Sequence, residues 1–187
     1  HPIAGSERSG VLAADANLYR HHKVILTPLA QTSSASIMLV REMWEFCGAS
    51  VLEMSVTHHD EVLAATSHLP HLLAFSLVDT LAGEEENQEI FRYAAGGFRD
   101  FTRIAASDPV MWHDIFLANH DALLSVLDHF TQDLDKLRKA VESRDSQTLL
   151  GVFTRAKSAR EHFTKILSGQ SYTNTMNTKN VIFKMKA

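Results

Sequence analysis

A long run of regularly spaced apolar residues constrains the fold of this chain more than any other feature. Between residues 109 and 142 the apolar side chains recur every three or four residues, which is the period of one helix face. They are Ile115, Phe116, Leu123, Leu127, Phe130, Leu134, Leu137 and Val141. One continuous helix of this length would extend about 50 Å, longer than a domain of this size is wide. We therefore expect a partner along the helix, supplied in part by a second subunit.

The segment before this run has a strand–helix–strand pattern. Residues 23–27 are rich in β-branched side chains and stop at Pro28, residues 33–46 are amphipathic and end before Gly48, and residues 50–56 form a second β-rich run. This order is typical of the end of an α/β unit. No glycine-rich phosphate loop accompanies it, so we expect the dinucleotide-binding loop to lie outside this sequence.

The rest of the sequence predicts helices. Residues 59–81 are expected to form one helix kinked at Pro70, Gly96-Gly97 interrupts the next helix, and Asp108-Pro109 is an N-cap signal that starts the long one. Leu149 and the apolar residues after it begin a further helix that could pair antiparallel with the long helix.

The predicted fold is thus mainly α. It comprises the end of a Rossmann-type domain in residues 1–57, a helical domain in 58–168, and a tail in 169–187. The tail could be a linker, a terminal strand or a frayed end.

Composition excludes several classes of protein. No uninterrupted apolar run approaches the roughly 20 residues of a membrane span, and a net charge of −4 gives no basic field for nucleic acid. The single Cys47 favours a reducing compartment, so we expect a cytoplasmic protein without membrane or nucleic-acid partners.

Five strings of residues occur in an informative order. They are His1-Pro2-x-x-Gly5, His59-Asp60, Ser67-His68-Leu69-Pro70-His71, Gly96-Gly97-Phe98-Arg99-Asp100-Phe101-Thr102-Arg103 and Ser107-Asp108-Pro109-Val110-Met111-Trp112. Together they resemble the prephenate dehydrogenase family over roughly residues 1–167. The opening His-Pro, with no initiator Met, then indicates the later part of a longer protein.

The resemblance implies a function. It implies oxidative decarboxylation of prephenate to 4-hydroxyphenylpyruvate, with NAD or NADP as cofactor, in tyrosine biosynthesis. Prephenate or arogenate would be the substrate, a second copy the partner, and tyrosine a candidate inhibitor. It also implies that residues 1–187 carry the substrate side of the site and the dimer interface. The apolar stripe itself predicts that Leu127, Phe130 and Leu134 lie near the contact. Without the glycine loop, residues 1–187 alone should be inactive.

The resemblance assigns site residues as well. It makes His1 the catalytic base, a role that suits imidazole because its ordinary pKa is near 6.5. It places a substrate carboxylate on Arg103, with Asp100 nearby, and the substrate side chain on His71. Polar contacts would come from Ser6 and Glu7, and Trp112 would line the pocket or belong to the core. For Arg99 an exposed ion pair is favoured over function.

Two other interpretations remain open. A metal site would use His59, His68 and His71, but a straight helix places the first two about 180° apart and no further zinc-like ligand follows, so we expect no metal. A hydrolase built on His59-Asp60 would need that metal. Alternatively, the chain is a non-catalytic helical dimerisation module in which the apolar stripe is itself the function.

Overall fold

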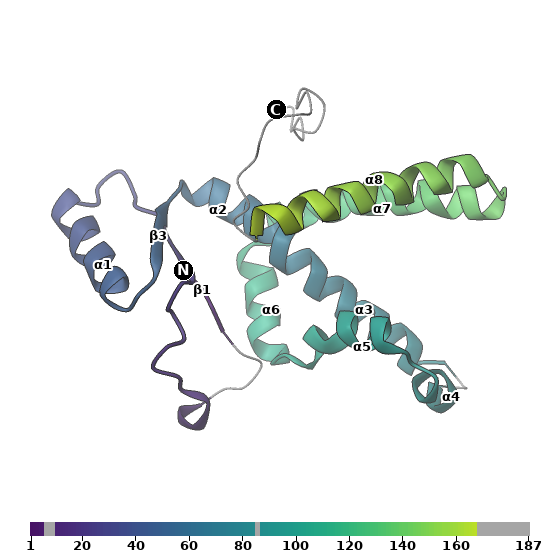
Figure 1. The fold of residues 1–187 in the computed structure, drawn as a ribbon, viewed down its shortest axis with the longest axis horizontal. Coiled ribbons are helices and arrows are strands. Elements are labelled where there is room, and N and C mark those ends of the chain that lie inside the picture. The colour runs from purple at the N-terminus through teal and green to yellow at the C-terminus, as the bar shows by residue number, and fades with distance from the viewer. Residues whose placement is uncertain (6–9, 85–86, 168–187) are drawn as a thin grey trace. The chain divides into compact units, whose positions relative to one another are not determined.

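The computed structural model describes residues 1–5, 10–84 and 87–167, and the predicted tail lies outside them. The chain divides into two compact units, His1–Thr131 and Gln132–Ala187. It is mainly helical with one small sheet, as predicted (Figure 1). The strands are β1 (Pro2–Ile3), β2 (Lys23–Leu26) and β3 (Ser50–Glu53). The helices are η1 (Val11–Ala13), α1 (Ser34–Phe46), α2 (Val56–Leu63), η2 (Ala64–His68), α3 (Leu69–Ala82), α4 (Asn87–Arg92), α5 (Gly96–Thr102), η3 (Arg103–Ala106), α6 (Pro109–Ala118), α7 (His120–Glu142) and α8 (Ser146–Leu167).

The sheet has the order β1-β2-β3. β2 and β3 are parallel and joined through α1, so the predicted strand–helix–strand unit is confirmed. β1 pairs antiparallel with β2, which the sequence did not predict because two residues carry no recognisable pattern. Val24, in the central strand, is completely buried and fixes the centre of this small core.

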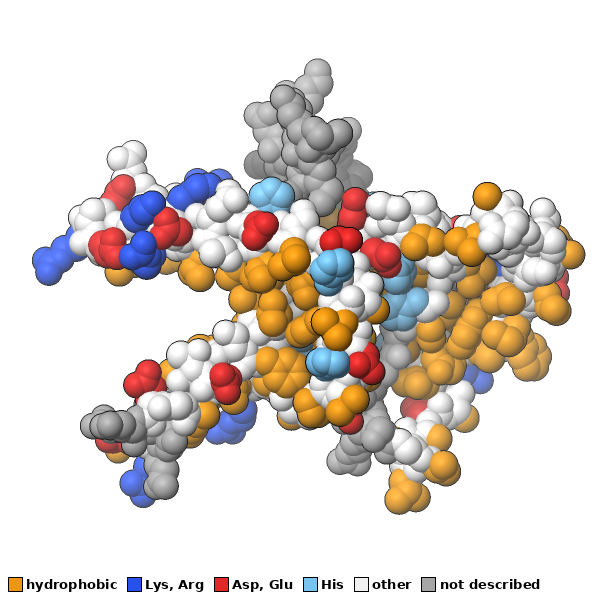
Figure 2. Space-filling model, turned by 180° about the vertical axis from the view of Figure 1, so that it is seen from behind, with side chains coloured by type: hydrophobic (Ala, Val, Ile, Leu, Met, Phe, Trp, Pro, Cys, Tyr) orange, Lys and Arg blue, Asp and Glu red, His pale blue; other side chains and the backbone are white. Residues whose placement is uncertain are grey.

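Helix α1 begins where the sequence predicts, because the Ser33 hydroxyl accepts a hydrogen bond from the Ser36 amide. It ends before Gly48, whose φ of 82° is in the left-handed region. None of its residues is buried. Its exposed apolar residues are Met38, Leu39, Val40, Met43 and Phe46. Figure 2 shows hydrophobic side chains gathered over the end of the molecule that holds α1 and the sheet.

Helix α2 starts earlier than predicted. The Ser55 hydroxyl accepts a hydrogen bond from the His58 amide, so the helix starts at Val56 and β3 ends at Glu53. The predicted strand to residue 56 and helix start near residue 58 are therefore wrong. Valine favours strands in isolation, but an N-cap serine directly before it stabilises the helix.

The predicted kink at Pro70 is wrong in position, because the irregularity lies one turn earlier. Residues Ala64–His68 form a π-helical turn, at the end of which the Leu69 amide donates to the Ala64 carbonyl. Pro70 has no N–H, and in a regular helix its ring would clash with the carbonyl of Thr66. A wider turn before the proline relieves that clash, and α3 then continues regularly.

The run from Val56 to Ala82 has the length and apolar composition of a membrane span. Core helices of soluble proteins meet the same two criteria, so the finding by itself is weak. In the structure 28% of its most apolar window is buried.

Helix α3 packs against α5 and η3. Although Arg99 and Arg103 are four residues apart, they do not belong to one regular helix, since α5 ends at Thr102 and Arg103 opens a 3₁₀ turn. The Thr102 hydroxyl donates to the Phe98 carbonyl at 2.8 Å, a bond that often accompanies helix bending.

The predicted 34-residue helix is also wrong as a single element. Asp108 caps α6 as predicted by accepting from the Met111 amide, but the helix stops at Ala118 and α7 begins at His120. Between them Asn119 has φ −117° and ψ 37°, outside the helical region.

The second unit contains the end of α7, a tight turn and α8. Arg144 has φ 54°, its amide donates to the Val141 carbonyl, and the Asp145 amide donates to the Ala140 carbonyl. These two bonds are those of a Schellman turn, which ends α7. The Asp145 carboxylate then caps α8 by accepting from the Thr148 amide and hydroxyl, which lowers the pKa of that carboxyl. The predicted following helix is confirmed.

Candidate active site

The sheet holds His1 by its backbone. The His1 nitrogen donates to the Ile25 carbonyl at 2.8 Å, and the Ile25 amide donates to the His1 carbonyl at 2.9 Å. This pair extends the β1–β2 ladder by one residue. Because Ile25 is buried, the backbone of His1 is anchored to the core while its side chain is exposed.

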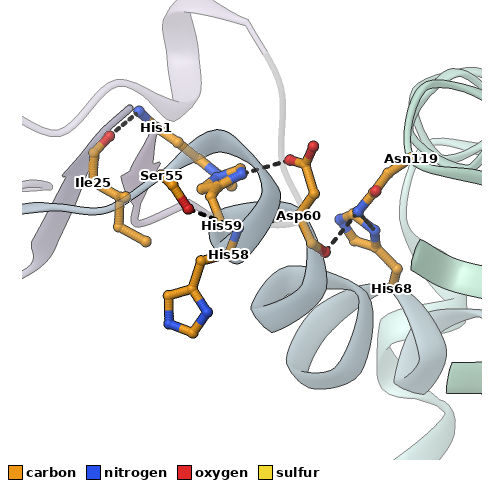
Figure 3. A network of polar contacts seen from close by, with 8 residues as sticks. All are labelled: His1, Ile25, Ser55, His58, His59, Asp60, His68 and Asn119. Carbon is orange, nitrogen blue, oxygen red and sulfur yellow. Dashed lines mark hydrogen bonds and ion pairs between the residues drawn. The ribbon is translucent and has the colours of Figure 1, made fainter. Parts of the chain in front are cut away.

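The His1 ring is in contact with helix α2. Its Nδ1 lies 2.8 Å from Nε2 of His59, and Nδ1 of His59 lies 2.8 Å from Oδ1 of Asp60 (Figure 3). The two rings meet edge to face, with centroids 5.1 Å apart. The His59 side chain is only 18% exposed, so most water is excluded from the middle of this chain of contacts. Three side chains therefore form one line that ends at the exposed ring of His1.

A second polar contact holds Asp60 through its backbone. The side-chain amide of Asn119 donates to the Asp60 carbonyl at 2.9 Å and lies 3.2 Å from Nδ1 of His68. His68 is the buried polar residue of the described core. Burial lowers the pKa of His68, as do the neighbouring His59 and His71, whereas Asp60 raises it. His68 is thus held mainly in the neutral form.

His71 and Trp112 form a stacked pair. Their ring centroids are 3.6 Å apart with planes at 21°, and Nδ1 of His71 donates to the Ser67 carbonyl in the π-helical turn. Burial lowers the pKa of His71. A neutral His71 would then present a free lone pair on Nε2. The indole N–H of Trp112 is the one buried side-chain polar atom without a partner among the described residues.

Two more of the predicted site residues lie in the described part of the first unit. Arg103 on η3 and Asp100 on α5 are both exposed, and both elements pack against α3, which carries His71. Ser6 and Glu7 lie outside the described residues. Arg99 is exposed. The structure thus brings His71 and Trp112 together, and it joins His1 to residues that were not predicted to serve it.

Sequence reasoning missed the contacts that His59, Asp60 and Asn119 make. The sequence offered one signal, the His59-Asp60 pair, which belongs to the strings that carry the family resemblance. Asn119 belongs to none of these strings, so no motif indicated its contacts. Across the described ranges, no group of three or more His, Cys, Asp or Glu side chains is arranged to hold a metal ion.

Comparison with known proteins identifies the family. Residues 1–53 match the model of the prephenate dehydrogenase nucleotide-binding domain, and residues 55–155 match that of the prephenate dehydrogenase dimerization domain. The chain therefore carries segments that match both domain models of this family. The chain belongs to the prephenate dehydrogenase family.

Individual relatives agree with this assignment. The chain is 49% identical to a cyclohexadienyl dehydrogenase of Zymomonas mobilis, over 86% of this chain and 55% of that protein. It is 41% identical to a prephenate dehydrogenase of Bacillus subtilis, over 86% of this chain and 44% of that protein.

A solved structure also agrees. The prephenate dehydrogenase of Aquifex aeolicus in complex with hydroxyphenyl propionate and NAD+ superposes with a TM-score of 0.81 and is 42% identical, covering 87% of this chain and 57% of that one. The chain thus spans about half the length of the relatives it matches.

Proposed function

We propose that this chain carries the substrate side of a prephenate or broader cyclohexadienyl dehydrogenase. The protein would convert prephenate to 4-hydroxyphenylpyruvate and CO₂ with NAD or NADP, in the cytoplasm. The main observation in support is the exposed His1 ring, anchored by its backbone and held at one ring nitrogen by His59. Prephenate or arogenate is the proposed substrate, and tyrosine is a candidate inhibitor.

The residues present fit one edge of a nicotinamide cofactor site. β2, α1 and β3 form a parallel unit of the kind found in dinucleotide-binding sheets, but the loop of residues 27–33 between β2 and α1 contains no glycine. The pyrophosphate cradle is therefore not supplied by this loop. When bound, the nicotinamide would accept the hydride from the substrate.

In this proposal His1 moves the proton. As the hydroxyl-bearing ring carbon loses hydride, the O–H bond breaks and the proton passes to His1, so that a carbonyl forms. Loss of CO₂ leaves the electrons of the broken C–C bond in the ring and moves charge onto the carbonyl oxygen, so that an aromatic phenolate forms. The phenolate then takes up a proton to give the phenol. A positioned base contributes roughly 10² to 10⁴ in rate.

The substrate carries two carboxylates, and Arg103 is the proposed clamp for one of them. A guanidinium binds a carboxylate through two parallel hydrogen bonds. Asp100 lies near Arg103 in sequence, and His71 and Trp112 form a partly enclosed aromatic surface that suits the substrate side chain. Ser6 and Glu7 remain proposed polar contacts.

Two substitutions in the complete enzyme test these roles. His1→Asn should preserve the fold and lower kcat by roughly 10² or more, because an amide can hydrogen-bond to the hydroxyl but does not take up its proton. Arg103→Gln should mainly raise KM, because a carboxylate clamp acts in ground and transition states alike. Steady-state kinetics distinguish the two. The same kinetic pattern for both variants would contradict the assignment of base and clamp.

A further inference from the structure

The hydrogen bonds that link His1, His59 and Asp60 can all donate in one direction, from His1 to His59 and from His59 to Asp60. We propose that Asp60 and His59 are positioning residues that fix the tautomer of His1, leaving its Nε2 free to accept a proton. This proposal rests on the proposed function, in which His1 is the base. It adds two residues whose role that function does not require.

The direction follows from the donors and acceptors. An ionised carboxylate only accepts hydrogen bonds, so Asp60 Oδ1 accepts one from Nδ1–H of His59, 2.8 Å away. Neutral His59 then carries a lone pair on Nε2. That lone pair accepts from Nδ1–H of His1, also 2.8 Å away. A neutral His1 has one ring proton, so its Nε2 is unprotonated.

The same line stabilises the charge that forms. When Nε2 of His1 takes the hydroxyl proton, the ring becomes an imidazolium that still donates from Nδ1 to His59. The negative charge of Asp60 is one ring away, and the low exposure of His59 limits screening by water between them. The contact therefore favours both the reactive tautomer and its protonated product.

Other titratable groups surround this line. On α2, His58 lies 3.9 Å from Glu61, and both are exposed or half-buried. From the π-helical turn, His68 is near enough for His59 and Asp60 to affect its pKa. The backbone of Asp60 is held separately by Asn119, so a change in the Asp60 carboxyl leaves that bond in place. Among the described residues, only Asp60 contributes an anion that contacts His59 directly.

A competing arrangement has a doubly protonated His59. Its Nε2–H would then donate to His1 Nδ1, the His1 proton would sit on Nε2, and His1 would be unable to act as a base. The distances alone fit both arrangements. In the competing case, removing the Asp60 carboxylate would favour loss of the second proton from His59. His1 could then act as a base, so the rate would rise.

The chain contains a matched control pair. His113 and Asp114 on α6 are also adjacent in sequence, with Nδ1 and Oδ1 2.9 Å apart, but both are exposed. Asp114→Asn removes the same charge from the same local geometry.

The test is the pH dependence of kcat/KM for the complete enzyme with prephenate. Asp60→Asn should lower kcat by roughly 10- to 100-fold with little change in KM, because neither Asp60 nor His59 is proposed to touch substrate. Loss of the carboxylate also destabilises the His1 imidazolium, so the acidic limb should move about one unit to lower pH. Asp114→Asn should match the unchanged enzyme. An unmoved limb, or a faster Asp60→Asn enzyme, would overturn the proposal.

A second pair of variants separates positioning from folding. His59→Gln can still offer an oxygen to His1 Nδ1, whereas His59→Phe offers no acceptor. We expect kcat of His59→Gln to be roughly 10-fold higher than that of His59→Phe, a difference of the size that one hydrogen bond to a charged group contributes. Equal melting temperatures of the two variants would show that the difference does not come from folding. Equal rates would overturn the proposal.

If His1→Asn keeps full activity, the base itself is misassigned. If His1→Asn is inactive while Asp60→Asn resembles Asp114→Asn, only the positioning role fails.

Discussion

Single side chains in this molecule connect elements that are distant in sequence. Asn119 uses its amide to donate to the Asp60 carbonyl and to His68 Nδ1, across 59 and 51 residues of sequence. Because Nδ1 of His68 accepts this bond, the neutral ring carries its proton on Nε2. Protonating Nδ1 would require this bond to break.

This arrangement predicts a pH dependence of stability. The pKa of His68 is lowered in the folded state, chiefly by burial, so the unfolded chain binds the proton more readily. The contribution of His68 is therefore fully present above its unfolded pKa of about 6.5 and is lost as pH falls through that value. His71 acts in the same direction, since burial lowers its pKa too.

Thermal melting between about pH 8 and pH 5 brackets that unfolded pKa and checks this expectation. The melting temperature should fall less steeply on acidification for His68→Asn, which removes the titrating ring, than for the unchanged protein. His113→Asn, which removes an exposed imidazole, serves as the control. Identical slopes for all three proteins would show that His68 does not titrate on unfolding.

At the scale of elements, the sequence predicted those helix starts that are determined by a side chain within a few residues. The caps at Ser33 and Asp108 start helices where expected, since each hydroxyl or carboxylate satisfies a free amide within three residues. The breaks at Asn119 and in the π-helical turn were not predicted. Asn119 is held by a distant backbone carbonyl, and the position of the wide turn depends on how the helix accommodates Pro70.

In the candidate site too, the sequence indicated individual residues but not the contacts between residues that are distant in sequence. The family resemblance selected His1, His71 and Trp112, and the structure places the last two in contact. Periodicity gave no means to predict that His1 meets His59, because that contact joins the start of the sheet to α2 across 58 residues. Tertiary contacts of this kind are invisible to spacing within one element.

The turn after α1 gives a prediction at the same scale. Gly48 has φ 82°, and a Cβ there would lie 3.0 Å from Cγ of Arg20 and 3.4 Å from its Cα. Gly48→Ala should therefore lower the free energy of unfolding by about 1–2 kcal/mol, through backbone strain and the close contact. Denaturant titration of the complete protein measures this change.

Gly97→Ala provides the control. Gly97 lies in α5, a Cβ at this position would have no neighbouring atom within 4 Å, and alanine favours a helix. The substitution should be neutral or slightly stabilising. Equal losses at both positions would contradict the argument from φ and contact.

At the scale of the whole molecule, we propose that the protein is a homodimer. The matching family model is that of a dimerization domain, and α7 leaves Leu134 52% exposed and Leu127 and Phe130 half-buried. A two-fold contact between copies would cover this face without open-ended growth.

Light scattering on the complete protein tests the dimer. Leu127→Asp combined with Leu134→Asp should convert it to monomer or aggregate, since buried carboxylates are costly at an apolar contact. Thr131→Asp with Gln132→Asp adds the same charge at exposed polar positions of α7 and should leave the dimer intact. A stable dimer with both pairs would place the contact elsewhere.

The bare face of α1 has a consequence for residues 1–187 prepared alone. Phe46 is 94% exposed and Leu39 69% exposed, so α1 is a second apolar surface besides α7. A chain with one self-associating surface forms a closed dimer, whereas a chain with two such surfaces can bind a further copy at each and polymerise. We expect residues 1–187 prepared alone to form linear oligomers of dimers, whose length increases with concentration. Covering the apolar face of α1 alone should leave a discrete dimer.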